Sequence, residues 1–293
     1  KGNRSVDFEE LKWLQPGLSW SPDNEKIVVA AKAGKGDVLH IIDVKTRKTK
    51  KYELDMDGVF SAAWSPRGNE IAFVGQSGES SDIYIFNIDT ELSRKITDDI
   101  FTDSYPSWKP DGSQIVFVSD RGDYVEGEFS GLMYEHDYSQ TDIYAVEIES
   151  GDISRITDTD YNESHPVWAN TKNSLFYTAD HNGVWNLFIH PLENSFDPGA
   201  VGVKQESQPY AITNVLTGLQ QPTLSQDDNM LIFAGYAGIG WDLYSLANPL
   251  RLKRKTVEPT QFILNRETDT ESIKDLRRHT STQLDKGVSE GYS

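Results

Sequence analysis

Histidines and acidic residues are the side chains of this sequence that could do chemistry, but their spacing matches no catalytic arrangement. The chain has six His and no Cys, so it has neither a thiol nucleophile nor a disulfide framework. No two His show the H-E-x-x-H spacing that places two metal ligands on one helical turn. A Ser-His-Asp triad, whose members need only meet in space, is left open. We therefore expect a non-enzymatic chain without a cofactor.

One acidic stretch partly matches a calcium loop. Asp158, Asp160 and Asn162 have the spacing of the first three oxygen ligands in such a loop. The sixth position, however, is Glu163 rather than Gly, and the twelfth is Ala169 rather than Glu. The spacing makes these three residues a weak calcium candidate, and we predict no metal site.

A second group of residues has types suited to binding, because acidic, aromatic and amide side chains recur at corresponding places along the chain. Loops that carry such side chains on a rigid scaffold are common binding sites. The candidate binding residues are Asp103, Tyr105, Asp120, Tyr134, Glu163, His165, Asp180 and Gln221. Their arrangement depends on the elements around them.

Those elements form a repeat. Each copy has an anchor residue, a tight turn and an apolar strand that starts seven residues after the anchor, as in Trp108-Lys-Pro-Asp-Gly112 followed by Ile115. Pro presets φ for such a turn, and Asp-Gly supplies its positive-φ positions. The five anchors are Trp20, Trp64, Trp108, Trp168 and Leu224.

Two further strands complete most copies. The third strand opens on a short polar residue, as in Asp82-Ile83-Tyr84, and the fourth ends in Ile-Thr, as at Ile96-Thr97. Four strands per unit at spacings of 44 to 60 residues predict an all-β fold, a β-propeller of four-stranded blades with five recognisable repeats. We expect the four Trp anchors to be buried between neighbouring sheets. A sixth, incomplete blade and a single β-sandwich remain alternatives.

Propeller geometry places the candidate residues on one face. Successive strands are antiparallel, so the loop that enters strand one and the loop between strands two and three share a face. Tyr105, His165 and Gln221 occupy equivalent positions near the channel mouth, and the insertion 121–141, which contains Tyr134, joins them. We expect this acidic and aromatic face to bind a partner. The alternatives are solvated loops without a ligand, and aromatic residues that only fold the insertion onto its own blade.

The W-S-P-D-G turn, the D-I-Y strand and the R-x-I-T ending resemble the TolB-type propeller repeat over about residues 16–248. Related propellers occur in dipeptidyl peptidases and prolyl oligopeptidases. The segment 235–250, which ends W-D-L-Y-S-L-A-N-P-L, resembles the last propeller blade of large bacterial envelope proteins. The resemblance implies a periplasmic or envelope-associated domain within a larger polypeptide or complex. TolB-like domains commonly have six blades, whereas five are recognisable here.

Bulk properties limit the partners. The formal charge of −18 repels phosphate backbones, which argues against nucleic acid. No apolar run reaches the length of a membrane span, so we expect no membrane insertion by this segment. The predicted domains are 1–15, a strand of a preceding or closing blade; 16–250, the propeller; and 251–293, an extension that is partly strand or loose. Because the sequence starts at Lys1 rather than Met, we expect a processed or excised piece.

These observations favour a non-catalytic TolB-like binding or scaffold domain for a protein or peptide partner in the bacterial envelope. One alternative is an accessory propeller that filters substrates for a peptidase domain elsewhere in the parent chain. Another is a carbohydrate-binding or lyase propeller, which would need clustered His ligands or aromatic platforms near a basic catalytic residue.

Overall fold

The anchor turns form as the sequence predicts. After every anchor, the next backbone N–H donates to a carbonyl five residues further on, for example Ser65 N to Glu70 O and Lys109 N to Gln114 O, both at 2.9 Å. The fourth residue after four of the five anchors has a positive φ, between 55° and 90°: Asn24, Gly68, Gly112 and Asp228. Gly, Asn and Asp adopt this conformation at the lowest cost, so these short local motifs set the spacing between the first two strands.

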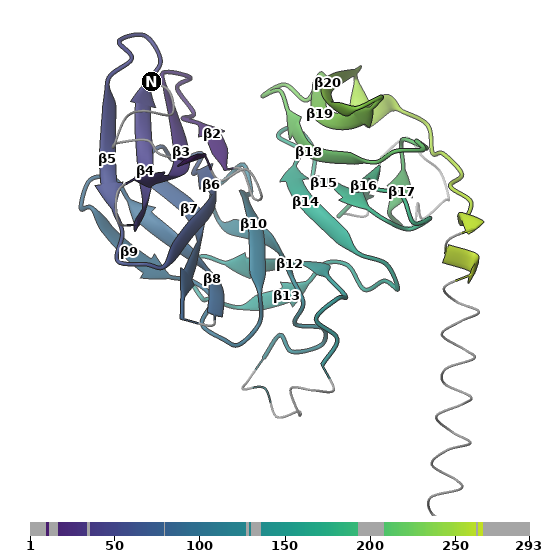
Figure 1. Ribbon diagram of the computed structural model, residues 1–293, viewed down its shortest axis with the longest axis horizontal. Coiled ribbons are helices and arrows are strands. Elements are labelled where there is room, and N and C mark those ends of the chain that lie inside the picture. Colours follow the sequence, from purple (N-terminus) through teal and green to yellow (C-terminus); the bar gives the residue numbers. More distant parts are fainter. Residues whose placement is uncertain are drawn as a thin grey trace, which may run out of the picture.

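The computed structural model describes residues 10–11, 17–33, 36–78, 80–126, 129, 136–192, 208–261 and 263–265. They form five consecutive antiparallel sheets, so the predicted all-β propeller is confirmed (Figure 1). Blade 1 contains β1 (Glu10–Leu11), β2 (Leu18–Trp20), β3 (Lys26–Ala33), β4 (Gly36–Asp43) and β5 (Thr49–Glu53). Blade 2 contains β6 (Gly58–Trp64), β7 (Glu70–Ser77), β8 (Ser80–Asn87) and β9 (Leu92–Lys95). Both β1 and β2 pair with β3.

The other three blades follow the same order. Blade 3 contains β10 (Asp103–Trp108), β11 (Gln114–Ser119), β12 (Asp142–Glu147) and β13 (Ile153–Arg155). Blade 4 contains β14 (Glu163–Trp168), β15 (Ser174–Ala179), β16 (Asn186–Pro191) and β17 (Tyr210–Ala211). Blade 5 contains β18 (Leu219–Leu224), β19 (Met230–Ala237) and β20 (Gly240–Ala247). Blade 5 therefore has three strands within the described residues, where blades 2 to 4 have four.

The Ile-Thr endings have a structural role. The side-chain oxygens of Thr97, Thr157 and Thr213 accept backbone N–H groups of the third strands, from Ile83, Ile143 and Leu187, at 2.8–2.9 Å. Each hydroxyl thereby ties the end of a blade to its third strand. This explains why the same dipeptide recurs in three blades.

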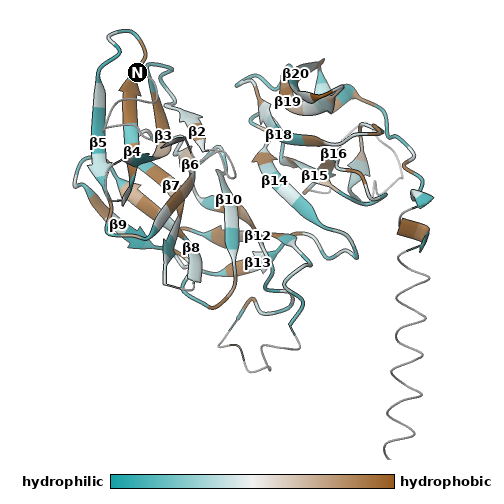
Figure 2. Cartoon of the chain, viewed as in Figure 1, coloured by the Kyte–Doolittle hydropathy of each residue, from teal (hydrophilic) through white to brown (hydrophobic). Residues whose placement is uncertain are grey.

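The core lies between the blades. Four apolar clusters join blade 1 to 2, 2 to 3, 3 to 4 and 4 to 5. The anchors Trp64, Trp108 and Trp168 belong to the first three clusters, with 6–8% of each side chain exposed. Trp108 also donates its indole N–H to the carbonyl of Ala63, in the neighbouring blade, at 3.0 Å. In Figure 2 the hydrophobic colour lies mainly on the strands of the sheets.

The expectation for Trp20 was wrong. This anchor is 48% exposed, because within the described residues no apolar cluster joins blade 5 to blade 1. Figure 1 shows the five sheets as an arc with β2 and β18 at its two ends. A Trp is buried here only where a preceding blade covers it, and blade 1 has none in the described part of the chain.

The chain after blade 5 returns over blade 4. A short 3-10 helix, η2 (Pro249–Arg251), follows β20. Beyond it, Lys255 N donates to Ala211 O at 2.8 Å, and Arg254 lies over the ring of Tyr210 at 4.8 Å. Residues 252–260 form no regular strand, and 261 and 263–265 are helical rather than the strand considered for this extension.

Candidate binding site at the inner strands

Four residues in the innermost strands share an unusual backbone conformation. Ser61, Tyr105, His165 and Gln221 each stand three residues before an anchor and have φ values of 49–54°. At each, the pairing with the second strand shifts by a bulge. A left-handed non-glycine residue costs on the order of 1–3 kcal/mol and is often found at functional sites. We call these four residues the inner-strand row.

Blade 1 has a glycine at the corresponding position. A Cβ on Gly17 would lie 2.1 Å from the backbone nitrogen of Ala62, next to the bulge at Ser61. No side chain fits at that distance, so the glycine allows the inner strands of blades 1 and 2 to approach closely. The row therefore occupies blades 2 to 5, whose inner strands lie around the centre of the arc (Figure 1).

Tyr105 and His165 are neighbours within the row. Their ring centroids lie 4.1 Å apart, with 36° between the ring planes. Burial lowers the pKa of His165 to about 4 and raises the pKa of Tyr105. Both side chains are therefore uncharged at neutral pH, and the buried Nδ1 of His165 has no hydrogen-bond partner within the described residues. Gln221, in the next strand, is exposed. These three predicted residues occupy equivalent positions, but in the middle of their strands rather than on the loop face near the channel mouth, because each stands at the bulge of its strand pair.

Asp103 is placed differently from a surface ligand. It is fully buried, and the guanidinium of Arg121 donates to its two oxygens at 2.8 and 3.0 Å. Arg121 is buried as well, and it also contacts Asp99 at 2.9 Å and Ser119 at 3.1 Å. Burial raises the pKa of Asp103 to about 6, against the opposing effect of Arg121. This cluster holds the start of β10 to the end of β11.

Glu163 occupies the corresponding position in blade 4 and is also buried. The hydroxyls of Thr157 and Thr159 donate to its two oxygens at 3.2 and 2.8 Å. Burial, with the carboxyl of Asp142 nearby, raises the pKa of Glu163 above its usual range. Asp142 in turn contacts Arg155 at 2.7 Å. Both acidic residues at the first strand position are thus engaged in internal contacts.

Asp120 and Asp180 join the two classes of loop that share a face. Asp120 accepts the backbone N–H of Thr102, and Asp180 accepts that of Asn162, both at 2.8 Å. Asp120 is buried, which raises its pKa, whereas Asp180 is partly exposed. In blades 3 and 4, this aspartate therefore connects the loop that enters the first strand to the loop that follows the second strand.

The insertion after β11 packs in part on its own blade. The ring of the buried Phe101 lies 5.7 Å from the rings of Tyr124 and Phe129 and 5.2 Å from that of His136. Tyr138 is 53% exposed. The candidate Tyr134 lies outside the described residues.

The calcium candidates do not converge. Asp158 contacts Arg155 at 3.0 Å, the side-chain oxygen of Asn162 accepts the N–H of Thr141 at 2.9 Å, and Asp160 is exposed. In the described part of the chain, a different set of three carboxylates has oxygens close enough together to share a metal ion, all within 4.8 Å of one another: Asp82, Asp99 and Asp103. Their oxygens already face the cations of Lys95, at 2.9 Å from Asp82, and of Arg121.

Sequence reasoning missed three features of this region. It did not identify Ser61 as a fourth member of the row, although the distance to the anchor Trp64 would have shown it. It also missed the left-handed conformation, which residue types do not indicate. Finally, Arg121 was treated as the start of a loop, whereas its side chain is among the largest that are fully buried.

Comparisons with known proteins agree with this architecture. The TolB beta propeller domain family matches residues 10–125. No curated protein matches the sequence. A TolB protein of Agrobacterium tumefaciens has a TM-score of 0.62 at 16% identity, over 80% of this chain and 77% of that one. TolB of Acinetobacter baumannii has a TM-score of 0.59 at 17% identity, over 80% of this chain and 52% of its own.

A puromycin hydrolase mutant has a TM-score of 0.56 at 11% identity, over 88% of this chain and 40% of that one. At identities of 11–17%, these structural similarities show a common fold and nothing more. No described helix is long and apolar enough to cross a membrane. Residues 10–125 thus match the TolB beta propeller domain family, and the rest of blade 3 with blades 4 and 5 continues the same β-propeller architecture.

Proposed function

We propose that this chain is a non-catalytic TolB-like propeller that holds a segment of a protein or peptide against the inner-strand row. The observation that carries the proposal is the row itself, in which four non-glycine residues share a left-handed conformation at one position. Recurrence in four blades is expected of a built surface rather than of an isolated strained turn. The Tyr105–His165 pair gives this surface an aromatic centre, and the exposed Gln221 adds an amide.

The chemistry of the row suits a polypeptide better than a charged small molecule. Tyr105 and His165 are uncharged at neutral pH, so they offer ring faces and hydrogen-bonding atoms without a net charge. Aromatic residues are enriched at the centres of protein interfaces. The chain's charge of −18 would attract a basic partner from a distance. That Tyr134 and its neighbours in the insertion take part in this contact stays a prediction.

The contacts of the row favour binding over catalysis. A general base of the Ser-His-Asp kind needs a carboxylate that orients the imidazole, and Nδ1 of His165 has no partner in the described part of the chain. The buried carboxyls Asp103 and Glu163 are held by Arg121 and by threonine hydroxyls. These contacts assign them to holding the strands in place.

Peptide selection tests this proposal. A random dodecapeptide phage library is panned on the immobilised chain, and labelled peptides from it are titrated by fluorescence anisotropy. We expect Tyr105→Ala and His165→Ala to weaken binding by about tenfold or more, as loss of a central aromatic contact does. Lys172→Ala, in the exposed turn after Trp168, is the control at the opposite end of the blade. Unchanged affinity in both row variants, with the melting temperature of the wild type, would rule the row out.

The proposal includes a periplasmic or envelope-associated location, as a domain of a larger polypeptide or complex. Its support is the TolB-type match and the two TolB folds. The peptidase alternative rests on the puromycin hydrolase fold, which this chain covers for 40% of its length. Translating the reading frame around the coding sequence would decide between the two, since a flanking hydrolase domain is expected only for the second.

A further inference from the structure

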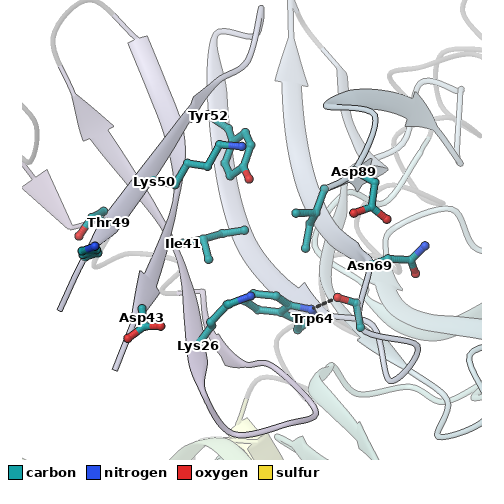
Figure 3. A pocket seen from close by; sticks show the side chains of 12 residues that line it. Lys26, Ile41, Asp43, Thr49, Lys50, Tyr52, Trp64, Asn69 and Asp89 are labelled. Atoms are coloured by element: carbon teal, nitrogen blue, oxygen red, sulfur yellow. Dashed lines mark hydrogen bonds between the residues drawn. The ribbon is translucent and has the colours of Figure 1, made fainter. Parts of the chain in front are cut away.

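A pocket of about 350 Å³ opens between blades 1 and 2, on the side of the anchor turns (Figure 3). Its apolar walls are Ile41 of β4, Tyr52 of β5 and the anchor Trp64 of β6, and all three are buried in the sheet interface. The indole N–H of Trp64 donates to the carbonyl of Gly68 at 3.0 Å, which fixes the plane of the ring. The volume lies near the lower end of the range for small-molecule sites, roughly 300–1,000 Å³.

Three lysines border this pocket: Lys26, Lys48 and Lys50. Within the described residues, the ammonium groups of Lys26 and Lys48 form no ion pair. The ammonium of Lys50 contacts the exposed Glu91 at 2.7 Å and lies 4.5 Å from the centre of the Tyr52 ring. Such clustering is unexpected from the composition of a chain whose net charge is −18.

The acidic residues at the pocket offset this charge only in part. The carboxylate of Asp43 accepts the backbone N–H and the hydroxyl of Thr46 at 2.6 and 2.7 Å, so its oxygen stabilises its own turn. Asp89 is exposed at the opposite wall, where Figure 3 shows it beside Asn69. Lys26 pairs with Asp43 across β3 and β4, so its charge is offset in part, whereas Lys48 forms no ion pair within the described residues.

The same positions in blade 2 show what is particular to blade 1. Lys26 stands six residues after its anchor, as Glu70 does in blade 2. Lys50 pairs with Ile41 of the third strand, as Arg94 pairs with Ile85. Glu70 and Arg94 have opposite charges and lie 4.0 Å apart. Blade 1 places two lysines where blade 2 places an ion pair. Asp43, opposite Lys26 on β4, and Glu91, which contacts Lys50, offset part of their charge, and an anion in the pocket would offset the rest.

We propose that this pocket binds a small anion that carries an aromatic ring. The ring would lie against Trp64 and Tyr52, and its carboxylate or phosphate head would face Lys26, Lys48 and Lys50. A lysine ammonium is a flexible point charge that accepts either head group. The site is separate from the inner-strand row and does not depend on the function proposed for it.

Phenyl phosphate is the probe, and the indole N–H signal of Trp64 in ¹H–¹⁵N correlation spectra is the readout, assigned with Trp64→Phe. We expect a saturable shift of that signal, with affinity that falls as salt rises. Benzoate, titrated in parallel, shows whether a carboxylate serves as well as a phosphate. Phenol and inorganic phosphate each lack one half of the ligand, so both should bind at least about fivefold more weakly, because either half alone loses one set of contacts.

Neighbouring lysines on β5 provide the matched control. Lys50 borders the pocket, whereas the next residue, Lys51, points to the other face of the strand and contacts Glu53 at 2.8 Å. Lys26→Met and Lys50→Met should each weaken phenyl phosphate binding about fivefold or more, and Lys51→Met should leave it within about twofold. The site is refuted if Trp64 shows no saturable shift, if phenol binds as tightly as phenyl phosphate, or if Lys51→Met matches Lys50→Met.

Discussion

The interfaces between neighbouring blades and the two ends of the arc use the same repeat with opposite results. Trp108, between blades 2 and 3, is 7% exposed, whereas Trp20, at the free side of blade 1, is 48% exposed. Ile83 of β8 is fully buried against blade 3, and Leu243, its counterpart in β20, is 80% exposed. The residue type determines what a position can bury, and the neighbouring blade determines whether it does so.

This difference indicates that blade stability here comes from contacts between sheets. A single sheet has two faces and cannot cover both. Blades 2 to 4 have a neighbour on each side, but blades 1 and 5 have one each within the described residues. We therefore expect buried and exposed positions of the repeat to respond very differently to substitution or pH, and five experiments test this.

The largest contrast is expected between the two tryptophans. Trp108→Ala should lower the free energy of unfolding by about 3–5 kcal/mol, because it leaves a cavity in a packed interface. It also removes the indole hydrogen bond to Ala63. Trp20→Ala should cost less than about 1 kcal/mol, because half of that side chain is already in water. Guanidinium titrations measure both, and equal losses would show that blade 1 is covered in solution.

Charged groups should follow the same rule. Arg121→Met leaves the buried Asp103 unpaired and should cost about 3–5 kcal/mol at pH 7. Glu91→Gln breaks the exposed pair with Lys50 and should leave the unfolding midpoint unchanged. Urea titrations of both variants make the comparison, and a shift in Glu91→Gln as large as in Arg121→Met would contradict it.

The pH dependence of wild-type unfolding should carry the signature of Asp103. Its folded-state pKa, about 6, lies above the ordinary value of 3.8, so the native state holds this proton more tightly than the unfolded state does. The contribution is therefore favourable at low pH and is lost as the pH rises through about 6. Asp103→Asn should remove that part of the pH dependence between pH 4 and 6.

A smaller contrast is expected on the sheet faces. Ile83→Ala should cost about 2–5 kcal/mol, as deletion of a buried aliphatic side chain does. Leu243→Ala should stay within about 0.5 kcal/mol, because its side chain is exposed. Thermal unfolding followed by circular dichroism ranks the two variants. Similar losses would indicate that something covers β20 in solution.

The smallest effect concerns protonation inside the arc. His165 packs on Tyr105 between blades 3 and 4, and burial lowers its pKa to about 4. We expect its ring protons in NMR spectra to keep the chemical shifts of neutral imidazole from pH 8 down to about pH 5. Titration near the ordinary value of 6.5 would show that water reaches this part of the inner strands.

The fold could be predicted because its signals are local. The spacing from Trp64 or Trp108 to the next strand, with a turn between, requires no knowledge of distant contacts. The burial of Trp20 was predicted wrongly because it depends on a sheet that the repeat itself does not contain. The candidate acids Asp103 and Glu163 were expected on loops entering the first strands, whereas they are the first residues of β10 and β14, and only the structure shows that Arg121, Thr157 and Thr159 hold them inside.

The equivalence of Tyr105, His165 and Gln221 was visible from the repeat. Their left-handed backbone was not, because it follows from the bulge in each strand pair rather than from the residue types. The lysine pocket was missed for another reason. Its residues come from β3 to β5 of one blade and, in the next blade, from the anchor Trp64, its turn and the segment after β8, and no motif connects them.

The return of the chain over blade 4 has a mechanical consequence. Blade 5 packs against one neighbour within the described residues, yet the segment after it is fastened through Lys255 to Ala211 and through Thr260 to Asn182. Tension applied to the chain at residue 265 would therefore act first on these two hydrogen bonds to blade 4. Both would have to break before the force reached β20. A sheet with a neighbour on one side is thereby shielded from force that acts from the end of the described chain.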